Sequence, residues 1–514
     1  MESVPTHARR RENSSNSKSS RSDRGRASFV DDAAALEAMG HKQELKRNFS
    51  MMSMLGLAFA ILNTWTALAA SIPLALPSGG SSAVIWGLLV AGTCNLCLAA
   101  SLAEFLSAYP TAGGQYHWAA IVSWKSSSRG ISYITGWINL SRGTSFSSMW
   151  LYLSSHSFLN AFFTRLLPYF TKAAFLWSLT GFVVIVITVL ACASPDFQTG
   201  GFVYGQFRND TGWPDGLAWM LGLLQGAFAL TGFDATAHMI EEIPNPQRQG
   251  PKIMLYCIVI GMVTGFIFLS SLLFCVNNID DVITASWGPV LQIFMDATKS
   301  KAGSICLLIF PLFCMLFTTV TLVCTSTRMS YAFARDRGMP FSSFFARVHP
   351  TLEVPLNALF WTVGWVIVFG CIFLGSSSSF NAITSAAVVA LGVTYAIPPA
   401  IHLLRGRSML PEDRSFKIPG VLGWVLNIIG IVWSIVTTVL FVFPPGIPTT
   451  ANNMNYCIVA FGIMLAIAGT TWLFDGRKHY EGPRLGNIQG MEPPAVDHMG
   501  EVAVCADGMG KSEE

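Results

Sequence analysis

The chain has 514 residues, a formal net charge of +3 at pH 7, 52% hydrophobic residues and only 12% charged residues. Soluble domains carry about 25% charged residues, so this composition excludes an ordinary soluble protein. The apolar residues form continuous blocks long enough for membrane-spanning helices, which need about 20 residues each, and too long for barrel strands. The sequence therefore predicts an all-α polytopic membrane protein. We expect spans within 49–77, 83–103, 173–193, 216–240, 253–275, 302–327, 356–374, 381–404, 421–443 and 456–474.

The two ends of the chain are polar. Residues 1–48, which include RRRENSSNSKSSRSDRGRASF, are too polar to bury a core and predict a disordered cytoplasmic tail. Ser28 in RGRAS suits a basophilic kinase, although a plain positive tail is the simpler interpretation. We expect the membrane domain to cover 49–475 and a second cytoplasmic tail to cover 476–514. The eleven cysteines show no metal-ligand spacing, so we expect neither metal nor cofactor.

Polar residues interrupt the first span. Asn63, Thr64, Trp65 and Thr66 lie in the middle of an otherwise apolar run. Buried amide and hydroxyl groups require hydrogen-bond partners. Asn63 and Thr64 are therefore candidate substrate-binding residues, whereas Trp65 fits a wall of the site or an ordinary core aromatic equally well.

The region after the second span is too short for its expected crossings. With both ends of the chain on one side, residues 131–163 must cross the membrane an even number of times. Two crossings need roughly 40 apolar residues, and this stretch has a polar, arginine-containing middle, SRGTSFSS. Either these residues form short re-entrant elements or part of the third span is missing. We favour the second interpretation.

The span at 216–240 contains a second interruption, Thr231-Gly232-Phe233-Asp234. With 131–163 counted as two crossings, the interrupted spans are the first and the sixth, which correspond in two five-span halves. Interrupted helices at matching positions predict a secondary transporter built from inverted repeats, with its substrate between the breaks. Unwound backbone at this depth is tolerated only where it lines a cavity. An ammonium ligand could also use the faces of Trp65 and Phe233 and the charge of Asp234.

Each ionisable residue has a simpler alternative. The Asp234 carboxylate could bind substrate or a coupling proton, or it could cap the following half-helix by accepting from the backbone of Thr236 or Ala237. His238 could relay protons, or it could be a packed histidine bonded to a carbonyl. Glu241 and Glu242 follow the span and could form a gate or only pair with nearby arginines. Glu104, near the inner end of the second span, has the same two interpretations, gating and anchoring.

Charge counting orients the chain. With both termini inside, the predicted cytoplasmic loops after residue 173 carry thirteen basic residues and the predicted outer loops carry three, Arg208, Lys299 and Lys301. This bias follows the positive-inside rule. Asn209, in Asn-Asp-Thr, then faces outward as a candidate glycosylation site.

Several stretches resemble one family. SLAEFLSAYPTAGGQYHW (101–118), GFDATAHMIEEIPNP (232–246), RMSYAFARDRGMPFS (328–342) and KRNFSMMSMLGLAFAILNTW (46–65) are similar to signature stretches of fungal amino acid/choline permeases, in the amino acid–polyamine–organocation superfamily. The resemblance implies twelve spans in the leucine-transporter fold, a 5+5 inverted repeat. It also implies uptake of choline, γ-aminobutyrate, other amino acids or related amines across the plasma membrane, commonly driven by protons. Family members have a full third span after the Gly-Trp seen here at 136–137, and this chain departs from that pattern.

Together these features predict a proton-coupled symporter for a small amine or amino acid, acting as a monomer in the bilayer, with the eighth span contributing Thr318 and Thr319 to the site. An exporter of a specialised amine or alkaloid and a non-transporting nutrient sensor are the alternatives. A channel would not require two interrupted helices. The nine histidines are scattered rather than clustered, which disfavours an enzyme, and no feature indicates a nucleic-acid partner.

Overall fold

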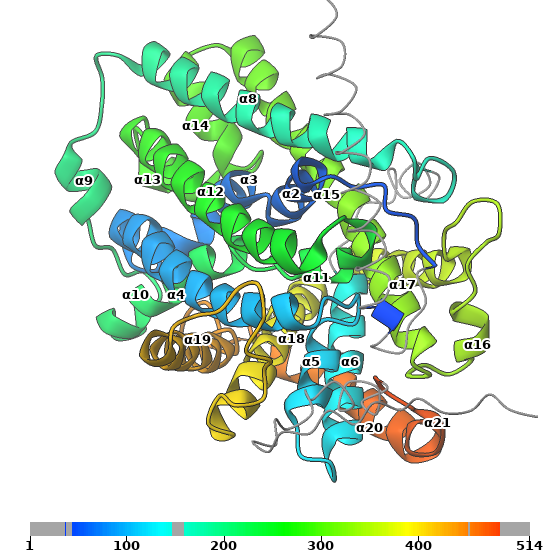
Figure 1. Ribbon diagram of the computed structural model, residues 1–514. Helices are drawn as coiled ribbons and strands as arrows, with labels where there is room; N and C mark the ends of the chain where they lie inside the picture. Colours follow the sequence, from blue (N-terminus) through cyan, green and yellow to red (C-terminus); the bar gives the residue numbers. More distant parts are fainter. Residues whose placement is uncertain (1–35, 38–43, 146–158, 451–452, 484–514) are drawn as a thin grey trace, which may run out of the picture.

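The computed structural model describes residues 36–37, 44–145, 159–450 and 453–483. Within these residues the regular structure is helical, apart from one isolated bridge between Ser78 and Asn209 (Figure 1). Every apolar block predicted from the sequence is mainly helical, and two of them contain a break. The long helices are α2 (Met51–Leu62), α3 (Thr64–Ala75), α4 (Gly80–Ala108), α6 (Ser128–Ser145), α8 (Leu167–Ala193), α10 (Asp215–Ala229), α12 (Pro246–Phe274), α15 (Lys301–Arg335), α17 (Leu356–Gly375), α18 (Ser377–Leu404), α19 (Gly420–Leu440) and α20 (Cys457–Thr471).

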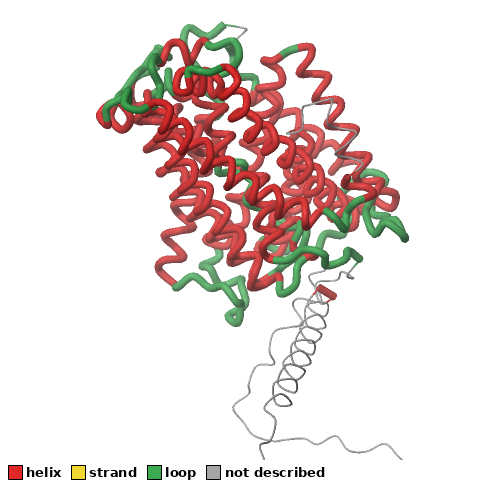
Figure 2. The backbone as a smooth tube through the Cα atoms, turned by 90° about the horizontal axis from the view of Figure 1, so that it is seen from above, coloured by secondary structure: helices red, strands yellow, loops and turns green. Residues whose placement is uncertain are grey.

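Short helices connect the long ones. They are α5 (Gln115–Val122), α9 (Gly200–Gly205), α11 (Ala235–His238), the 3-10 turn η1 (Ile240–Glu242), α13 (Ile279–Thr284), α14 (Pro289–Thr298), α16 (Ser342–Phe345), the π-helical turn η2 (Trp472–Gly476) and α21 (Arg477–His479). Figure 2 shows the long helices side by side, with most loops gathered at the two ends of the bundle. Eight helical stretches in the described residues are long and apolar enough to cross a membrane. The all-α polytopic prediction is confirmed.

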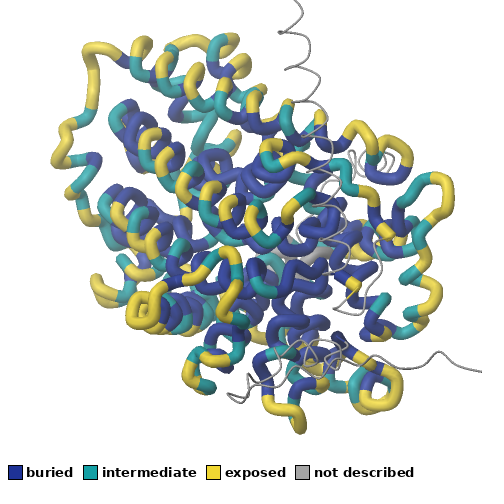
Figure 3. Tube along the Cα trace, viewed as in Figure 1, coloured by how far each residue is buried: buried dark blue, intermediate teal, exposed yellow. Residues whose placement is uncertain are grey.

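Buried residues concentrate in the middle of the bundle, and exposed ones lie on its outer helices and at its ends (Figure 3). Helix α4 is central, since it packs against α10, α12 and α19. Glycines allow α4 and α10 to approach closely: a Cβ atom on Gly226 would lie 2.8 Å from the Leu88 Cα, and one on Gly87 would lie 2.9 Å from the Leu223 Cα. Small residues at such contacts are the usual means of tight helix packing in membranes.

Gly222→Ala is expected to destabilise the bundle. A Cβ atom at Gly222 would lie 1.8 Å from the Ser78 carbonyl oxygen, so α10 would have to move away from the turn that joins α3 to α4. Overpacking of this kind costs about 1–3 kcal/mol, and a lower melting temperature in detergent would report it. Gly216→Ala, also in α10, is the matched control because no atom lies within 4 Å of its added Cβ. Equal melting temperatures for the two variants would contradict the prediction.

The chain between α4 and α8 contains α5, α6 and a gap in the described residues. Helix α6 has 18 residues, about 27 Å at 1.5 Å per residue, close to the roughly 30 Å hydrocarbon core. It packs against α5, α15, α17, α18 and α20. Residues 146–158 lie outside the described residues, so the missing part of a third span within 131–163 stays a prediction.

The packed part of the chain extends past both expected tail boundaries. Leu45 is buried against Tyr331 and Ala358, and the Glu44 carboxylate accepts a hydrogen bond from the Tyr331 hydroxyl. Tyr480 is fully buried, with its hydroxyl 2.6 Å from the Ser132 Oγ. Residues 44–48 and 476–483 are therefore part of the folded domain, whereas 1–35, 38–43 and 484–514, including Ser28, lie outside the described residues.

Candidate functional site

The two interrupted helices meet at their breaks. Asn63 separates α2 from α3 with a φ of 44°, and Gly232, between α10 and α11, has a φ of 109°. Glycine adopts a positive φ freely and asparagine more readily than other residues, which explains why the helices stop there. Helix α10 packs on α3 and α11 packs on α2, and a Cβ atom on Gly232 would lie 3.5 Å from the Ile61 side chain.

Side chains from neighbouring helices bind carbonyl groups at both breaks. The Thr318 hydroxyl of α15 donates to the Ala60 carbonyl at 2.7 Å, and the Asn95 amide of α4 donates to the Leu230 carbonyl at 3.3 Å. A buried carbonyl without a donor costs free energy, so these bonds stabilise the broken segments. Thr319 instead donates to the Met315 carbonyl of its own helix, and sequence reasoning missed Asn95.

Asp234 lies at the centre of a buried polar network. Its carboxylate accepts hydrogen bonds from the Gln115 amide at 2.8 Å and the Tyr395 hydroxyl at 2.6 Å, and lies 3.3 Å from His238 Nε2. The side chain is fully buried and makes no capping bond to α11. The capping alternative is therefore wrong, since the carboxylate is directed to other elements. No local sequence signal marked Tyr395 as a partner.

The hydrogen-bond geometry places an extra proton on Asp234 and His238. His238 Nδ1 lies 2.9 Å from the Ala112 carbonyl, which can only accept, so Nδ1 carries hydrogen. His238 Nε2 faces a carboxylate oxygen, and two bare acceptors would repel. Either Nε2 or the carboxyl group must therefore hold a second proton.

The two predicted aromatic residues, Trp65 and Phe233, pack against other side chains and are buried. Trp65 donates to the Ser178 hydroxyl at 2.9 Å, and its ring centre lies 4.9 Å from that of Phe268. Phe233 packs on Tyr395 with ring centres 4.8 Å apart. Trp65 is therefore a core aromatic toward α8 and α12, whereas Phe233 belongs to the network around Asp234.

The polar residues beside the breaks differ in their exposure. Thr64 is fully buried and its hydroxyl has no hydrogen-bond partner in the described part of the chain. The Asn63 side chain retains 8% exposure. The Thr231 hydroxyl donates to the Ala227 carbonyl one turn earlier, at 2.6 Å, which satisfies the last turn of α10.

The glutamates after α11 form buried ion pairs. Glu241 accepts two bonds from Arg335, at 2.9 and 3.1 Å, and one from the Ala112 amide at 3.0 Å. Glu242 pairs with Arg328 at 2.8 Å. Pairing with nearby arginines is therefore confirmed. These pairs tie the end of the broken helix to α15 at the predicted cytoplasmic end.

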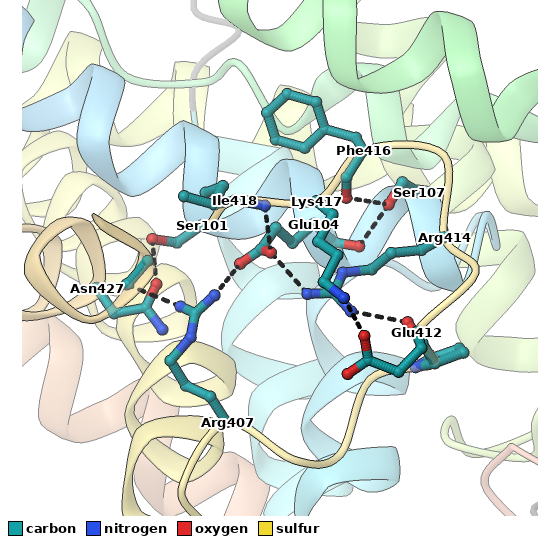
Figure 4. Close-up of polar contacts among 12 residues, drawn as sticks. Ser101, Glu104, Ser107, Arg407, Glu412, Arg414, Phe416, Lys417, Ile418 and Asn427 are labelled. Atoms are coloured by element: carbon teal, nitrogen blue, oxygen red, sulfur yellow. Dashed lines mark hydrogen bonds and ion pairs between the residues drawn. The ribbon is translucent and has the colours of Figure 1, made fainter. Parts of the chain in front are cut away.

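Glu104 anchors the loop between α18 and α19 (Figure 4). One carboxylate oxygen accepts from Arg407 at 2.7 Å, and the other accepts from Arg414 and from the Ile418 amide, each at 2.9 Å. Nearby, the Ser107 hydroxyl donates to the Phe416 carbonyl at 3.0 Å. Glu104 is 1% exposed, so three donors compensate the burial of its charge. The loop is thereby held against α4.

A further buried carboxylate, Asp336, joins α5 to the end of α15. Its carboxylate accepts from the Tyr116 hydroxyl at 2.8 Å and contacts His117 Nε2. Burial, and next the negative charge of Asp336, hold the pKa of Tyr116 well above its usual range. The phenol therefore stays protonated and remains a donor.

Comparison with known proteins identifies the family. The model of the amino acid permease family matches residues 141–465. A putative amino acid/polyamine transporter of Macrophomina phaseolina is 34% identical, over 79% of this chain and 97% of that protein. This chain belongs to the amino acid permease family. The permease is also 30% identical to a choline transporter of Saccharomyces cerevisiae, over 88% of this chain and 85% of that one. An amino-acid permease of Arabidopsis thaliana is 29% identical, over 88% of this chain and 96% of that protein.

Membership confirms the resemblance seen in the sequence. The permease is a multi-pass membrane transporter for amino acids or amines and not an enzyme.

Asn209 of the permease lies in a structured turn. Its side-chain amide donates to the Trp213 carbonyl at 2.7 Å and to Asp215 at 2.8 Å, and its oxygen accepts from the Thr211 hydroxyl at 2.8 Å. A glycan on this nitrogen would replace one of the two donated bonds. Glycosylation at Asn209 stays a prediction.

Proposed function

We propose that the permease is a secondary active transporter that carries one small amine or amino acid across the plasma membrane by alternating access, together with a proton. The substrate binds between the breaks, beside Asn63, Thr64, Thr231 and Gly232. The two five-span halves form an inverted repeat, and both termini are cytoplasmic. The observation that carries the proposal is the contact of two interrupted helices at their breaks, because broken helices place backbone donors and acceptors where an amine or a carboxylate can bind.

Asp234 and His238 hold the coupling proton in this proposal. The carboxylate already accepts from Gln115 and Tyr395, and its contact with His238 requires a shared proton. The substrate ammonium group then binds break carbonyls and the face of Phe233 rather than a free carboxylate. Proton release changes the charge of a fully buried pair, which links protonation to the arrangement of α11.

The buried ion pairs of Glu104, Glu241 and Glu242 close the cytoplasmic side. They join α4 and the segment after α11 to the loop between α18 and α19 and to α15. Opening toward the cytoplasm requires some of these pairs to separate. After a pair separates, its arginine and its glutamate both lie at the surface of the opened path, where water solvates the two charges.

Uptake by fungal cells that express the full chain tests the proposal. Radiolabelled choline, γ-aminobutyrate, arginine and leucine are offered singly at external pH 5 and 7, and the others are added as competitors. We expect saturable uptake of at least one compound, faster at pH 5 and reduced by a protonophore. Export of a preloaded label without uptake would favour the exporter, whereas saturable binding without flux in either direction would favour the sensor. A fluorescent protein fused to the permease in the same cells shows whether it resides in the plasma membrane.

A further inference from the structure

The carbonyl of Leu230 is held from outside the broken helix. Helix α10 ends at Ala229 and α11 begins at Ala235, so the Leu230 carbonyl lies past the regular helical bonds. The Asn95 Nδ2 atom of α4 donates to it at 3.3 Å. Asn95 is 4% exposed, so water does not compete for this carbonyl.

A tryptophan from α19 determines which way the Asn95 amide faces. Trp433 Nε1 lies 2.8 Å from Asn95 Oδ1. An indole N–H can only donate, so the amide oxygen must face Trp433 and the amide nitrogen must face Leu230. If the amide rotated by half a turn, its NH₂ group would oppose the indole N–H and its oxygen would oppose the carbonyl. The indole therefore selects the one orientation that supports the break.

The Leu230 side chain and the peptide plane after it are also held in place. The Leu230 side chain fits between two glycines, because Cβ atoms on Gly92 and Gly261 would each lie 3.2 Å from its methyl carbons. The peptide plane that joins Leu230 to Thr231 is also held at both ends, since the Thr231 amide donates to the Phe228 carbonyl at 3.2 Å. A peptide unit is rigid and planar, so this plane defines where Gly232 begins its turn.

We propose that Asn95 and Trp433 are positioning residues of the substrate site. Trp433 orients the Asn95 amide, Asn95 fixes the Leu230 carbonyl, and this bond aims the backbone groups of 231–234 at the ligand. Neither residue touches the ligand. The inference rests on the proposed function only in placing the ligand at the breaks, and it assigns to α19 a part in ligand affinity.

Trp433→Phe removes the donor and keeps an aromatic ring. We expect the apparent KM for radiolabelled choline or γ-aminobutyrate, whichever the unsubstituted chain transports, to rise about three- to tenfold, the worth of one buried hydrogen bond, while the maximal rate changes less than about twofold. Trp86→Phe is the matched control, because Trp86 donates its N–H to the Tyr204 carbonyl at 2.8 Å on the exposed side of α4. Ser434→Ala, beside Trp433, removes a buried hydroxyl that has no hydrogen-bond partner among the described residues and should leave KM unchanged.

Hydrogen–deuterium exchange of the purified full chain tests the same inference without transport. In Trp433→Phe the peptide covering residues 228–236 should exchange at least about fivefold faster, since its carbonyl anchor is loosened, and Trp86→Phe should not change it. Unchanged exchange in this peptide overturns the positioning role, whether or not either probe is transported. An equal rise in KM for Trp433→Phe and Trp86→Phe also overturns it. Absence of transport by the unsubstituted chain contradicts the proposed function alone.

Discussion

Asp234→Asn is expected to abolish proton-driven accumulation of substrate. Asparagine has nearly the same shape and can still accept from Tyr395, but it cannot hold a proton, and its amide hydrogens would face donors at Gln115 and His238. A charged hydrogen bond contributes about 1.5–3 kcal/mol, and each 1.4 kcal/mol is a factor of ten. We therefore expect uptake at pH 5 to fall about ten- to hundredfold, and the remaining flux to lose its dependence on external pH.

The control for Asp234→Asn lies two residues further on. Thr236 is fully buried in α11, and its hydroxyl has no hydrogen-bond partner in the described part of the chain, so Thr236→Ala should retain uptake and its pH dependence. His238→Gln keeps a donor toward the Ala112 carbonyl but removes the imidazole ring. It should reduce pH dependence in the same direction as Asp234→Asn. Retention of a normal pH profile by Asp234→Asn would refute the assignment of the proton to this pair.

Glu104→Gln is expected to cause the largest loss of stability of any single change considered for this permease. Arg407 and Arg414 are only 7% and 5% exposed, so removal of the carboxylate leaves two buried guanidinium groups without a counter-charge. Breaking a buried ion pair by removing one partner costs about 3–5 kcal/mol. We expect a melting temperature in detergent lower by several degrees and less protein at the cell surface.

Two comparisons isolate the charge of Glu104. Glu412→Gln removes the exposed partner of Lys417 on the same loop and should leave the melting temperature unchanged, because exposed ion pairs contribute little. The triple replacement of Glu104, Arg407 and Arg414 by glutamine should be more stable than Glu104→Gln alone, since it removes the unpaired cations as well. If Glu104→Gln melts at the same temperature as Glu412→Gln, the carboxylate does not hold the loop.

Local sequence predicted the helices and the places where two of them break. Hydrophobicity over about 20 residues is a local property, and every apolar block is mainly helical in the structure. The break at Asn63 and the turn at Gly232 were also visible locally, because backbone with a positive φ selects asparagine and glycine. The missing part of a third span within 131–163 stays a prediction, because residues 146–158 lie outside the described residues. The extent of the folded ends was missed, because burial of Leu45 and Tyr480 depends on distant partners.

The sequence by itself determined that this chain is a polytopic membrane protein with two interrupted spans, and it selected Asp234, His238 and the three glutamates as candidates. Tertiary structure alone decided which groups those side chains contact. Asp234 meets partners 119 and 161 residues away, Asn95 meets a carbonyl 135 residues away, and Glu104 meets arginines more than 300 residues away. The physical reason is that a buried charge or carbonyl requires a partner, yet no local pattern states which helix supplies it. The packing of α4, α5, α18 and α19 around the breaks determines which partner each buried group meets.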